Sequence, residues 1–569
     1  MPRLFAPSFA AFNRAAIRPD LVAGLTVWAV LVPESLAYAT IAGVPPVVGL
    51  YAAVPALALY AVIGSSRQLV VSPMSATAAL SIGVVATVSS DPDDVVTLTT
   101  ALALATGLVA IAAGLLRLGF LASFISEPVL KGFIIGLALT ILVGQVPALV
   151  GVDKGSGNFF EKSWAVVSNL DDADALTVAV GVASFVALLA LRRFIPLLPA
   201  SLVVALAGIA AVALLGLDDH GLDVIGHIDS GLPQLGLPDL SSGQFIDLLG
   251  GAVGVMLVGF AEGLGAAKTY AAKEGYDIDA NRELLGLGAA NLGAGLTSGM
   301  VVNGSLSKTA VNGSAGARSQ LSGLTAAVLT VVTLLFLTGL FEQLPEATLA
   351  AIVIAAVIEL VDIASLERLY RVQTGRLAAV YKVSSRADFF AAVAALLGVL
   401  LFDTLPGLVI GIAVSLVLLI ARTSRPNIAS LAPVGDAADR PWIDADRNGD
   451  YPTVPGVLVV RVEAPLLFAN ADFVRMHVRD LAADAPDLRL VVLDGRSTPS
   501  IDVTASGMLI QLRSDLRRMG AELVLAEDIG QVRDVLAAAE PEGEPPLYPT
   551  IEAALAAVPP GPAPFTENG

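Results

Sequence analysis

Cysteine is absent from this 569-residue sequence, and histidine occurs only three times. Without cysteine the chain has no disulfide, no redox-active thiol and no thiolate metal site. His220, His227 and His477 fall in expected loops or in the C-terminal region, and the sequence contains neither a P-loop nor a dinucleotide-binding fingerprint. We therefore expect no metal site, no cofactor and no enzymatic activity.

Charge is also scarce, because charged residues make up only 15% of the chain while hydrophobic residues make up 55%. Soluble proteins carry about 25% charged residues. Apolar runs of about 18 residues or more, long enough to cross a ~30 Å hydrocarbon core, recur between Leu21 and Ile420. This pattern predicts an α-helical polytopic membrane protein.

Hydropathy places fourteen transmembrane segments along the chain, seven in each half of the apolar region. We expect them at 21–42, 45–64, 72–88, 97–116, 128–150, 174–191, 196–216, 248–267, 284–300, 304–316, 320–341, 346–361, 387–403 and 405–421. The first repeat then covers 21–216 and the second 248–425, with an extracellular linker at 217–247.

Positive charge gives the orientation, because Lys and Arg collect in cytoplasmic loops. The expected inner side holds Arg67, Arg117, Arg192, Arg193, Lys268, Lys273, Arg282, Arg318, Arg368, Arg371, Arg376, Lys382, Arg386, Arg422 and Arg425. The expected outer loops hold Lys154 and Lys162 among acids that include Asp91, Asp93, Asp94, Asp171, Asp172, Asp218 and Asp219. We therefore expect the N-terminal segment 1–20 and the C-terminal tail to be cytoplasmic.

Two of the segments, 72–88 and 304–316, are short and polar for a lipid environment. Each is the third in its group of seven, and each contains a Ser-x-Thr-Ala or Ser-Lys-Thr-Ala sequence after a Pro or Gly. Because seven is odd, the second group must cross the membrane upside down relative to the first. The sequence therefore predicts an inverted repeat.

Interrupted helices at matching places in inverted repeats indicate a transporter binding site near the membrane midplane. Free N–H groups and the positive dipole ends of such helices attract anions. Serine and threonine hydroxyls could add donors, and Lys308 could add a full positive charge. The alternatives are that the small polar residues only pack helices closely and that Lys308 extends to the interface.

Two carboxylates also fall inside expected spans, Glu34 after Pro33 and Glu262 between Ala261 and Gly263. An ionisable group costs roughly 2.5 to 3.5 kcal/mol at the centre of a membrane helix, so each is a functional candidate. A carboxylate that is protonated while an anion is bound and ionised when it leaves would couple the two fluxes. The alternative is a structural ion pair, for example between Glu262 and Lys308.

At these residues the chain resembles the SulP sulfate-permease family, also called solute carrier family 26. The resemblance spans nearly the whole chain. It rests on the stretches 20–26 (DLVAGLT), 31–39 (LVPESLAYA), 44–51 (VPPVVGLY), 64–68 (GSSRQ), 267–270 (AKTY), 275–284 (GYDIDANREL) and 304–312 (GSLSKTAVN).

The resemblance implies two inverted repeats of seven segments, divided into a core domain that holds the site and a gate domain, with a homodimer as the assembly. It implies that Ser307 is the anion-site serine, that Lys308 replaces an arginine common in animal members, and that Tyr38 is a site aromatic. Met74 stands where several relatives have an aromatic residue, and Glu34 where a glutamine is more usual. Glu262 matches an acid that the family associates with cation coupling.

The predicted substrate-binding residues come from three places in the sequence. They are Glu34, Tyr38, Met74, Ser75, Ala76, Thr77, Ser305, Leu306, Ser307, Lys308 and Thr309. The predicted coupling residues are Glu262 and Glu34, with protons favoured over sodium as the coupling ion.

After residue 425 the sequence changes to that of a globular domain. The part from Ser430 onward has 22 acidic and 11 basic residues, and so holds most of the net charge of −18. Strands are expected at 457–462, 490–493 and 522–525, each followed by an amphipathic helix. This resembles the STAS domain that the family carries after its last span, expected here at 454–558 after a linker at 426–453. The proline-rich end, 559–569, is expected to be disordered.

We therefore expect a secondary active transporter of small anions in a bacterial plasma membrane, working by proton-coupled symport. The candidate substrates are sulfate, bicarbonate and dicarboxylates, in that order. Rival interpretations are a sodium-coupled bicarbonate symporter, an uncoupled channel or exchanger, a proton–nucleobase symporter and a membrane-bound signalling protein. The expected partners are the anion, the lipid bilayer, a second copy and a cytoplasmic protein bound to the STAS domain. We expect no nucleic-acid partner.

Overall fold

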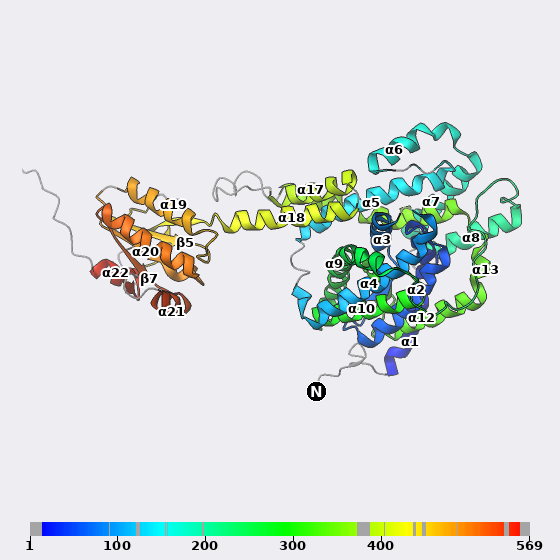
Figure 1. The fold of residues 1–569 in the computed structure, drawn as a ribbon, viewed down its shortest axis with the longest axis horizontal. Helices are drawn as coiled ribbons and strands as arrows, with labels where there is room; N and C mark the ends of the chain where they lie inside the picture. The colour runs from blue at the N-terminus through cyan, green and yellow to red at the C-terminus, as the bar shows by residue number, and fades with distance from the viewer. Residues whose placement is uncertain are drawn as a thin grey trace, which may run out of the picture. The chain divides into compact units, whose positions relative to one another are not determined.

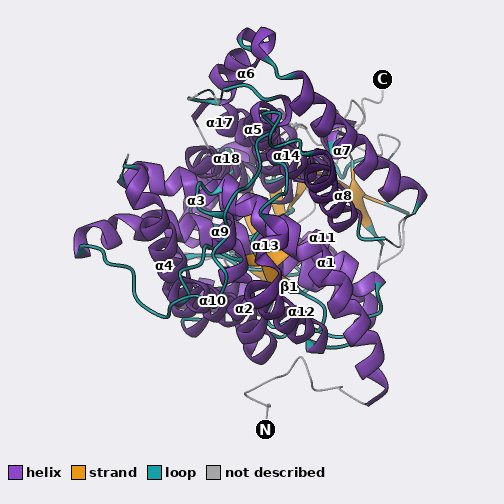
Figure 2. Cartoon of the chain, turned by 90° about the vertical axis from the view of Figure 1, so that its right-hand side faces the viewer, coloured by secondary structure: helices purple, strands orange, loops and turns teal. Residues whose placement is uncertain are grey.

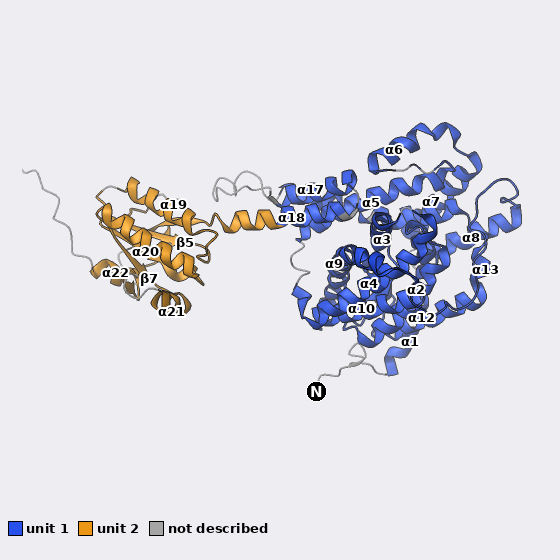
Figure 3. Ribbon diagram, viewed as in Figure 1, with its two compact units in different colours: residues 1–371, 388–415 blue, residues 372–387, 416–569 orange. Residues whose placement is uncertain are grey.

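The computed structural model describes most of the chain. The described residues are 14–89, 91–120, 126–153, 155, 157–195, 198–371, 387–402, 404–435, 440–445, 451–485, 487–539 and 545–557. They form two compact units, one of residues 1–371 and 388–415 and the other of residues 372–387 and 416–569 (Figure 3). Most of the expected N-terminal segment 1–20 and the whole expected tail 559–569 lie outside the described residues.

The first unit is built from helices (Figure 1). Its first half contains α1 (Ile17–Ile41), α2 (Pro46–Ile63), the strand β1 (Val70–Ser72), α3 (Ser75–Val88), α4 (Val95–Leu115), α5 (Glu127–Val150), α6 (Phe159–Ser168), α7 (Ala175–Phe194) and α8 (Ala200–Leu215). Its second half contains α9 (Ser242–Glu274), α10 (Ala280–Leu296), the strand β2 (Asn303–Ser305), α11 (Leu306–Ser314), α12 (Leu321–Val332), α13 (Thr338–Phe341), α14 (Glu346–Val357), α15 (Ile363–Arg371) and α17 (Ala387–Phe402). The helix α18 (Thr404–Thr423) follows.

Among the described residues, eight helices are long and apolar enough to cross a membrane. Four shorter apolar helices, α3, α8, α14 and α17, add to them. Each expected span corresponds to one of the helices or helix groups of the structure. The helical membrane fold is therefore confirmed, while the total of fourteen crossings stays a prediction.

Two α-helices in the described part of the first unit have no counterpart among the expected spans. The helix α6 has ten residues and α15 has nine, which is too short for a crossing. Both are amphipathic, and their charged residues lower the hydropathy of these short segments. Both lie between expected spans, in segments where the hydropathy predicts loops.

The packing of the helices has the symmetry of an inverted repeat. The first helix of the first half, α1, packs against α12, and the first helix of the second half, α9, packs against α4. Since α12 and α4 hold the same position in their own halves, the two contacts are equivalent. The strands β1 and β2 are a second equivalent pair, and they run antiparallel to each other. Figure 2 shows β1 surrounded by helices.

Glycines allow the backbones of these helices to approach closely, as small residues do in membrane proteins. A Cβ atom on Gly49 of α2 would lie 2.0 Å from the carbonyl oxygen of Ser35 on α1. On α5, a Cβ atom on Gly132 would lie 1.9 Å from the carbonyl oxygen of Ala392 on α17. The first contact fixes α2 against the part of α1 that carries Glu34.

The second unit contains a six-stranded mixed sheet with helices on its faces. Its elements are β3 (Ile428–Pro433), β4 (Trp442–Asp444), β5 (Val457–Val462), α19 (Ala471–Asp484), β6 (Leu490–Asp494), α20 (Val503–Arg518), β7 (Glu522–Ala526), α21 (Gly530–Ala539), β8 (Leu547–Tyr548) and α22 (Ile551–Ala557). The strand order is β4-β3-β5-β6-β7-β8, with β5 to β8 parallel and β3 antiparallel to both of its neighbours.

The three expected strands are present as β5, β6 and β7, each followed by a helix as expected. Their buried residues form one apolar cluster with α19, α20 and α21, and a second cluster lies on the opposite face with Trp442, Ile551 and Ala554. The structure also places β3 and β4 in this sheet, although both lie in the range 426–453 that was expected to be a linker.

Candidate functional site

The candidate site lies where the two short strands meet. Val70, Val71 and Ser72 of β1 pair with Ser305, Gly304 and Asn303 of β2. The helix α3 begins three residues after β1 ends, and α11 begins directly after β2. The antiparallel pairing therefore brings together the N-termini of two half-helices that are more than 200 residues apart in the sequence.

Side chains complete the hydrogen bonding of this strand pair, which lipid cannot supply. The backbone N–H of Val70 donates to Thr309 Oγ1 at 3.1 Å. The side-chain amide of Asn291 on α10 donates to the carbonyl of Val302 at 2.9 Å and accepts from the Val302 N–H at 3.0 Å. These contacts hold irregular backbone inside the bundle and fix where the half-helices begin.

The first turns of the half-helices present backbone N–H groups. The N-terminus of α3 has no side-chain cap, and the N–H groups of Ser75, Ala76 and Thr77 have no acceptor among the described residues. In α11, Ser305 Oγ accepts from the Lys308 N–H at 3.3 Å, while the N–H groups of Leu306 and Ser307 have no acceptor in the described part of the chain. Five donors and two helix dipoles therefore converge, as in known helix-terminus anion sites.

Lys308 supplies the positive charge of the site. Its side chain is only 1% exposed, so it does not extend to an interface. Its Nζ atom donates to the carbonyl oxygen of Pro73 at 2.9 Å and lies 3.2 Å from Oε2 of Glu34. It also lies 4.9 Å from the centre of the Tyr38 ring, within range of a cation–π contact. A single ammonium group thus joins α1, the start of α3, and α11.

Glu34 and Tyr38 complete this cluster from α1. They lie one helical turn apart and are both buried, and the Tyr38 hydroxyl donates to Glu34 Oε2 at 3.3 Å. The ion pair that the sequence suggested between Glu262 and Lys308 is not the one formed, because Lys308 pairs with Glu34. The two polar residues of α1 therefore lie in one cluster with Lys308, and their role in anion binding stays a prediction.

The hydroxyl groups have more varied partners than the sequence suggested. Thr309 Oγ1 donates its proton to the carbonyl of Ser305 at 2.5 Å, so this hydroxyl holds the backbone and has no proton left for an anion. Thr77 Oγ1 donates to the Met74 carbonyl at 3.3 Å. Ser305 and Ser307 lie with their hydroxyl oxygens 3.2 Å apart, and Ser307 is exposed. Ser307 is therefore the better placed of these donors.

Glu262 lies on α9, the helix that packs on β2. Its neighbour Gly263 and Gly259 let α9 approach β2 closely, since a Cβ atom on Gly259 would lie 3.0 Å from Cγ of Asn303. Oε2 of Glu262 is buried and has no hydrogen-bond partner among the described residues. Buried polar atoms in proteins nearly always have a partner, so this carboxylate is a position that can take up a proton or a cation.

Three features of the site were missed in the sequence. They are the carbonyl of Pro73, the bracing amide of Asn291, and Asn303, whose Nδ2 is buried without a partner in the described part of the chain. Asn303 and Asn291 line a cavity of about 10 Å³, which is the space that one water molecule needs. For Asn291 and Asn303 the available signal was an amide side chain inside an apolar region.

Comparison with known proteins gives the family. Residues 17–383 match the sulfate permease family, and residues 449–554 match the STAS domain. A probable sulfate transporter of Mycobacterium tuberculosis is 36% identical over 557 residues, covering 96% of both chains. Sulfate transporter 1.1 of Arabidopsis thaliana is 29% identical, covering 95% of this chain and 85% of its own.

Solved structures share the fold. The murine solute carrier 26 family member A9 anion transporter, in the inward-facing state, superposes with a TM-score of 0.85 at 22% identity, covering 97% of this chain and 94% of its own. The transmembrane domain of the cyanobacterium bicarbonate transporter BicA has a TM-score of 0.59 at 24% identity, covering 68% and 97%. The matched proteins are transporters and not enzymes. This chain therefore belongs to the sulfate permease family of membrane anion transporters and carries a STAS domain after its membrane unit.

Proposed function

We propose that this protein moves sulfate across a bacterial plasma membrane by proton-coupled secondary active transport, and that the anion binds between the first turns of α3 and α11. The observation that carries the proposal is the buried ammonium of Lys308 next to five backbone N–H groups without acceptors among the described residues. A dehydrated oxyanion needs such donors, because leaving its water is costly unless each oxygen is bonded again.

The pairing of Glu34 with Lys308 supports proton coupling. With Glu34 ionised, its carboxylate is bound to the cation that the anion requires. When Glu34 takes up a proton, the charge of Lys308 becomes available to an anion, and release of that proton favours anion release. Anion and proton would then bind together and leave together, which is symport.

Glu262 supports a second coupling position. Its buried oxygen, unpartnered among the described residues, lies on the helix that packs against β2, and a proton or a sodium ion there would satisfy it. Sodium-coupled symport is therefore the alternative that a specific observation favours. An uncoupled channel or exchanger has no such observation in its support.

The substrate proposal rests on the relatives of the chain. The mycobacterial and plant proteins that match most of its length are named as sulfate transporters. The five N–H donors and the ammonium suit a tetrahedral dianion, and bicarbonate and small dicarboxylates remain the other candidates. We further propose a homodimer with cytoplasmic termini, in which a core domain moves against a gate domain, and a cytoplasmic partner for the STAS domain.

The coupling is tested by uptake of radiolabelled sulfate, bicarbonate and succinate into proteoliposomes under an imposed inward proton gradient and then a sodium gradient. We expect sulfate to accumulate only with the proton gradient. Glu34→Gln and Glu262→Gln are tested separately. Each should remove the coupling, because an amide cannot carry the proton, and should leave downhill flux within about tenfold of wild type.

Glu274→Gln is the matched control, since Glu274 is an exposed carboxylate at the end of the same helix as Glu262. It should keep gradient-driven accumulation. Accumulation driven by the sodium gradient alone would mean that the coupling ion is sodium and not the proton. If anion flux in the wild type only runs downhill under both gradients, the proposal of coupling is refuted.

A further inference from the structure

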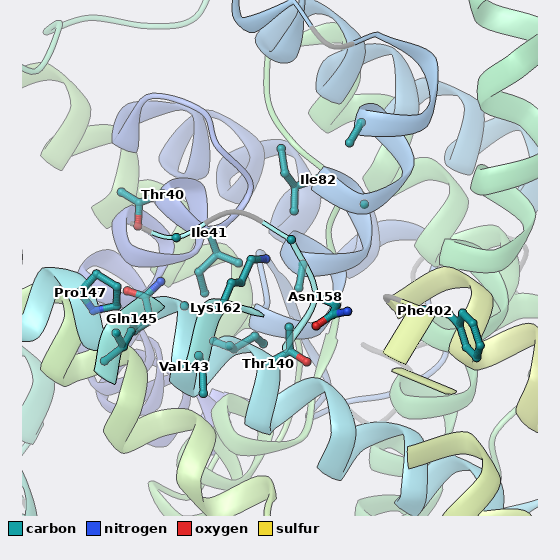
Figure 4. A pocket seen from close by; sticks show the side chains of 18 of the residues that line it. Thr40, Ile41, Ile82, Thr140, Val143, Gln145, Pro147, Asn158, Lys162 and Phe402 are labelled. Atoms are coloured by element: carbon teal, nitrogen blue, oxygen red, sulfur yellow. The ribbon is translucent and has the colours of Figure 1, made fainter. Parts of the chain in front are cut away.

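A pocket of about 660 Å³ lies beyond the site, toward the predicted outer side. It lies between the end of α1, one face of α3, the second half of α5, the helix α6 with the residues before it, and the end of α17. Its polar side chains are Thr40, Thr140, Gln145, Asn158 and Lys162. Figure 4 shows these side chains around the pocket, with the amino group of Lys162 directed into it.

The walls of the pocket continue into the candidate site. Four residues of α3 line the pocket at one face of the helix: Ala79, Ile82, Gly83 and Ala86. One turn earlier on that face stand Ser75 and Ala76, whose N–H groups belong to the site. On α1, Ile41 lines the pocket and lies one turn after Tyr38. Two separate helices therefore lead from the pocket to the place where the anion would bind.

The charge of the pocket differs from that of the surrounding outer loops. Lys162 is the one charged side chain among the described residues that line it. Within the described part of the chain, Lys162 has no ion-pair partner. The neighbouring Glu161 accepts from the backbone N–H of Asn158 at 3.0 Å and so is held by the start of its own helix. The pocket is therefore positive within an outer surface that is rich in Asp.

The two faces of α6 have different surroundings: one is exposed and the other lines the pocket. Phe160, Trp164 and Val167 recur at helical spacing and are exposed, which suits the aromatic belt at a membrane surface. Lys162 and Val166, on the other face, line the pocket. The amphipathic sequence of α6 thus fixes Lys162 toward the pocket instead of toward water.

We propose that this pocket is the outer entrance of the transport pathway and that Lys162 captures small inorganic anions there before they reach Lys308. The inference rests on the proposed function and adds to it a second anion-binding residue, on an element outside the half-helix site. A single cation in a cleft with low-dielectric walls raises the local anion concentration, and salt screens this effect.

The electrostatic part of the inference is tested without transport. Because the chain has no native cysteine, Thr140→Cys places one thiol in the pocket. The quantity measured is the ratio of the reaction rate of an anionic methanethiosulfonate to that of a cationic one of the same size. We expect Lys162 to raise this ratio, and Lys162→Gln to lower it about threefold to tenfold at low ionic strength. An unchanged ratio in Lys162→Gln would overturn the inference.

The transport part uses the full-length protein in proteoliposomes. Lys162→Gln should raise the KM for sulfate about threefold to tenfold at low ionic strength with little change in kcat, and the difference should shrink at high salt. Lys162→Arg should behave as wild type, because it keeps the charge. A KM that Lys162→Gln leaves unchanged, or an equal defect in Lys162→Arg, would overturn capture by charge. A wild type without anion uptake would instead refute the proposed function, and the thiol experiment would still decide whether the pocket attracts anions.

Discussion

Replacing Lys308 with methionine is expected to lower sulfate uptake at least about 100-fold. Methionine keeps most of the length and volume of the side chain but has no charge and no donor. It removes the hydrogen bond to the Pro73 carbonyl and the ion pair with Glu34. Hydrogen bonds to a charged group contribute about 1.5 to 3 kcal/mol each to the free energy of the site. A loss of about 2.7 kcal/mol corresponds to a 100-fold lower uptake.

The same change is expected to destabilise the protein, because Glu34 is only 4% exposed and would keep a buried charge without its partner. Breaking a buried ion pair from one side costs about 3 to 5 kcal/mol. The double variant Glu34→Gln/Lys308→Met should therefore recover thermal stability in detergent while staying inactive. The recovery separates loss of folding from loss of the anion site.

Lys268→Met is the matched control, since Lys268 is an exposed lysine on α9. It should transport sulfate at the wild-type rate. Lys308→Arg should keep part of the activity, because it keeps the charge but places a larger planar group among Glu34, Tyr38 and Pro73. A folded Lys308→Met protein with wild-type uptake would contradict the assignment of this lysine to the anion.

Replacing Gly304 with alanine is expected to lower uptake about 10-fold to 100-fold. Gly304 is the central residue of β2 and pairs with Val71. A Cβ atom there would lie 2.8 Å from the Cα of Gly263 on α9 and 3.0 Å from the methyl groups of Leu69. Overpacking of this kind costs about 1 to 3 kcal/mol, and relief requires β2 to move away from α9. The start of α11, and with it Lys308, would move with the strand.

Gly265→Ala is the control for this prediction, because Gly265 lies on α9, the helix against which β2 packs, but a Cβ atom there would meet no neighbouring element of the described chain within 4 Å. It should leave uptake unchanged. Uptake and thermal stability are measured together for both variants. If Gly304→Ala transports as well as Gly265→Ala, the spacing of β2 and α9 does not set the geometry of the site.

The two half-helices that carry the candidate site could be predicted from the sequence, because polar residues stand out in segments that are otherwise apolar. Ser75, Thr77, Ser307 and Lys308 stand out in a membrane region where most residues are apolar. Their matching places in two groups of seven segments indicated two half-helices, and the structure has both. The three central strands of the second unit were predictable because β5, β6 and β7 are short runs rich in Val and Leu, each followed by an amphipathic helix.

The pairing of groups within the site was not predictable, because it depends on side-chain positions that spacing does not fix. Glu34 and Glu262 are both carboxylates inside spans, and nothing in their spacing favours Glu34 as the partner of Lys308. The bracing roles of Asn291 and Thr309 depend on the path of β1 and β2 in three dimensions. Short elements were missed as well, since β4 has three residues and too little pattern to recognise.

The central claim is that the anion binds between the first turns of α3 and α11, next to Lys308. Selenate, a sulfate analogue, gives an anomalous X-ray signal at the selenium edge that the native chain, with sulfur only in its seven methionines, does not give. Crystals grown with selenate should show one strong anomalous peak at this place in the wild type and none there in Lys308→Met. Selenate bound only elsewhere in the wild type, at a concentration that inhibits sulfate uptake, would contradict the account.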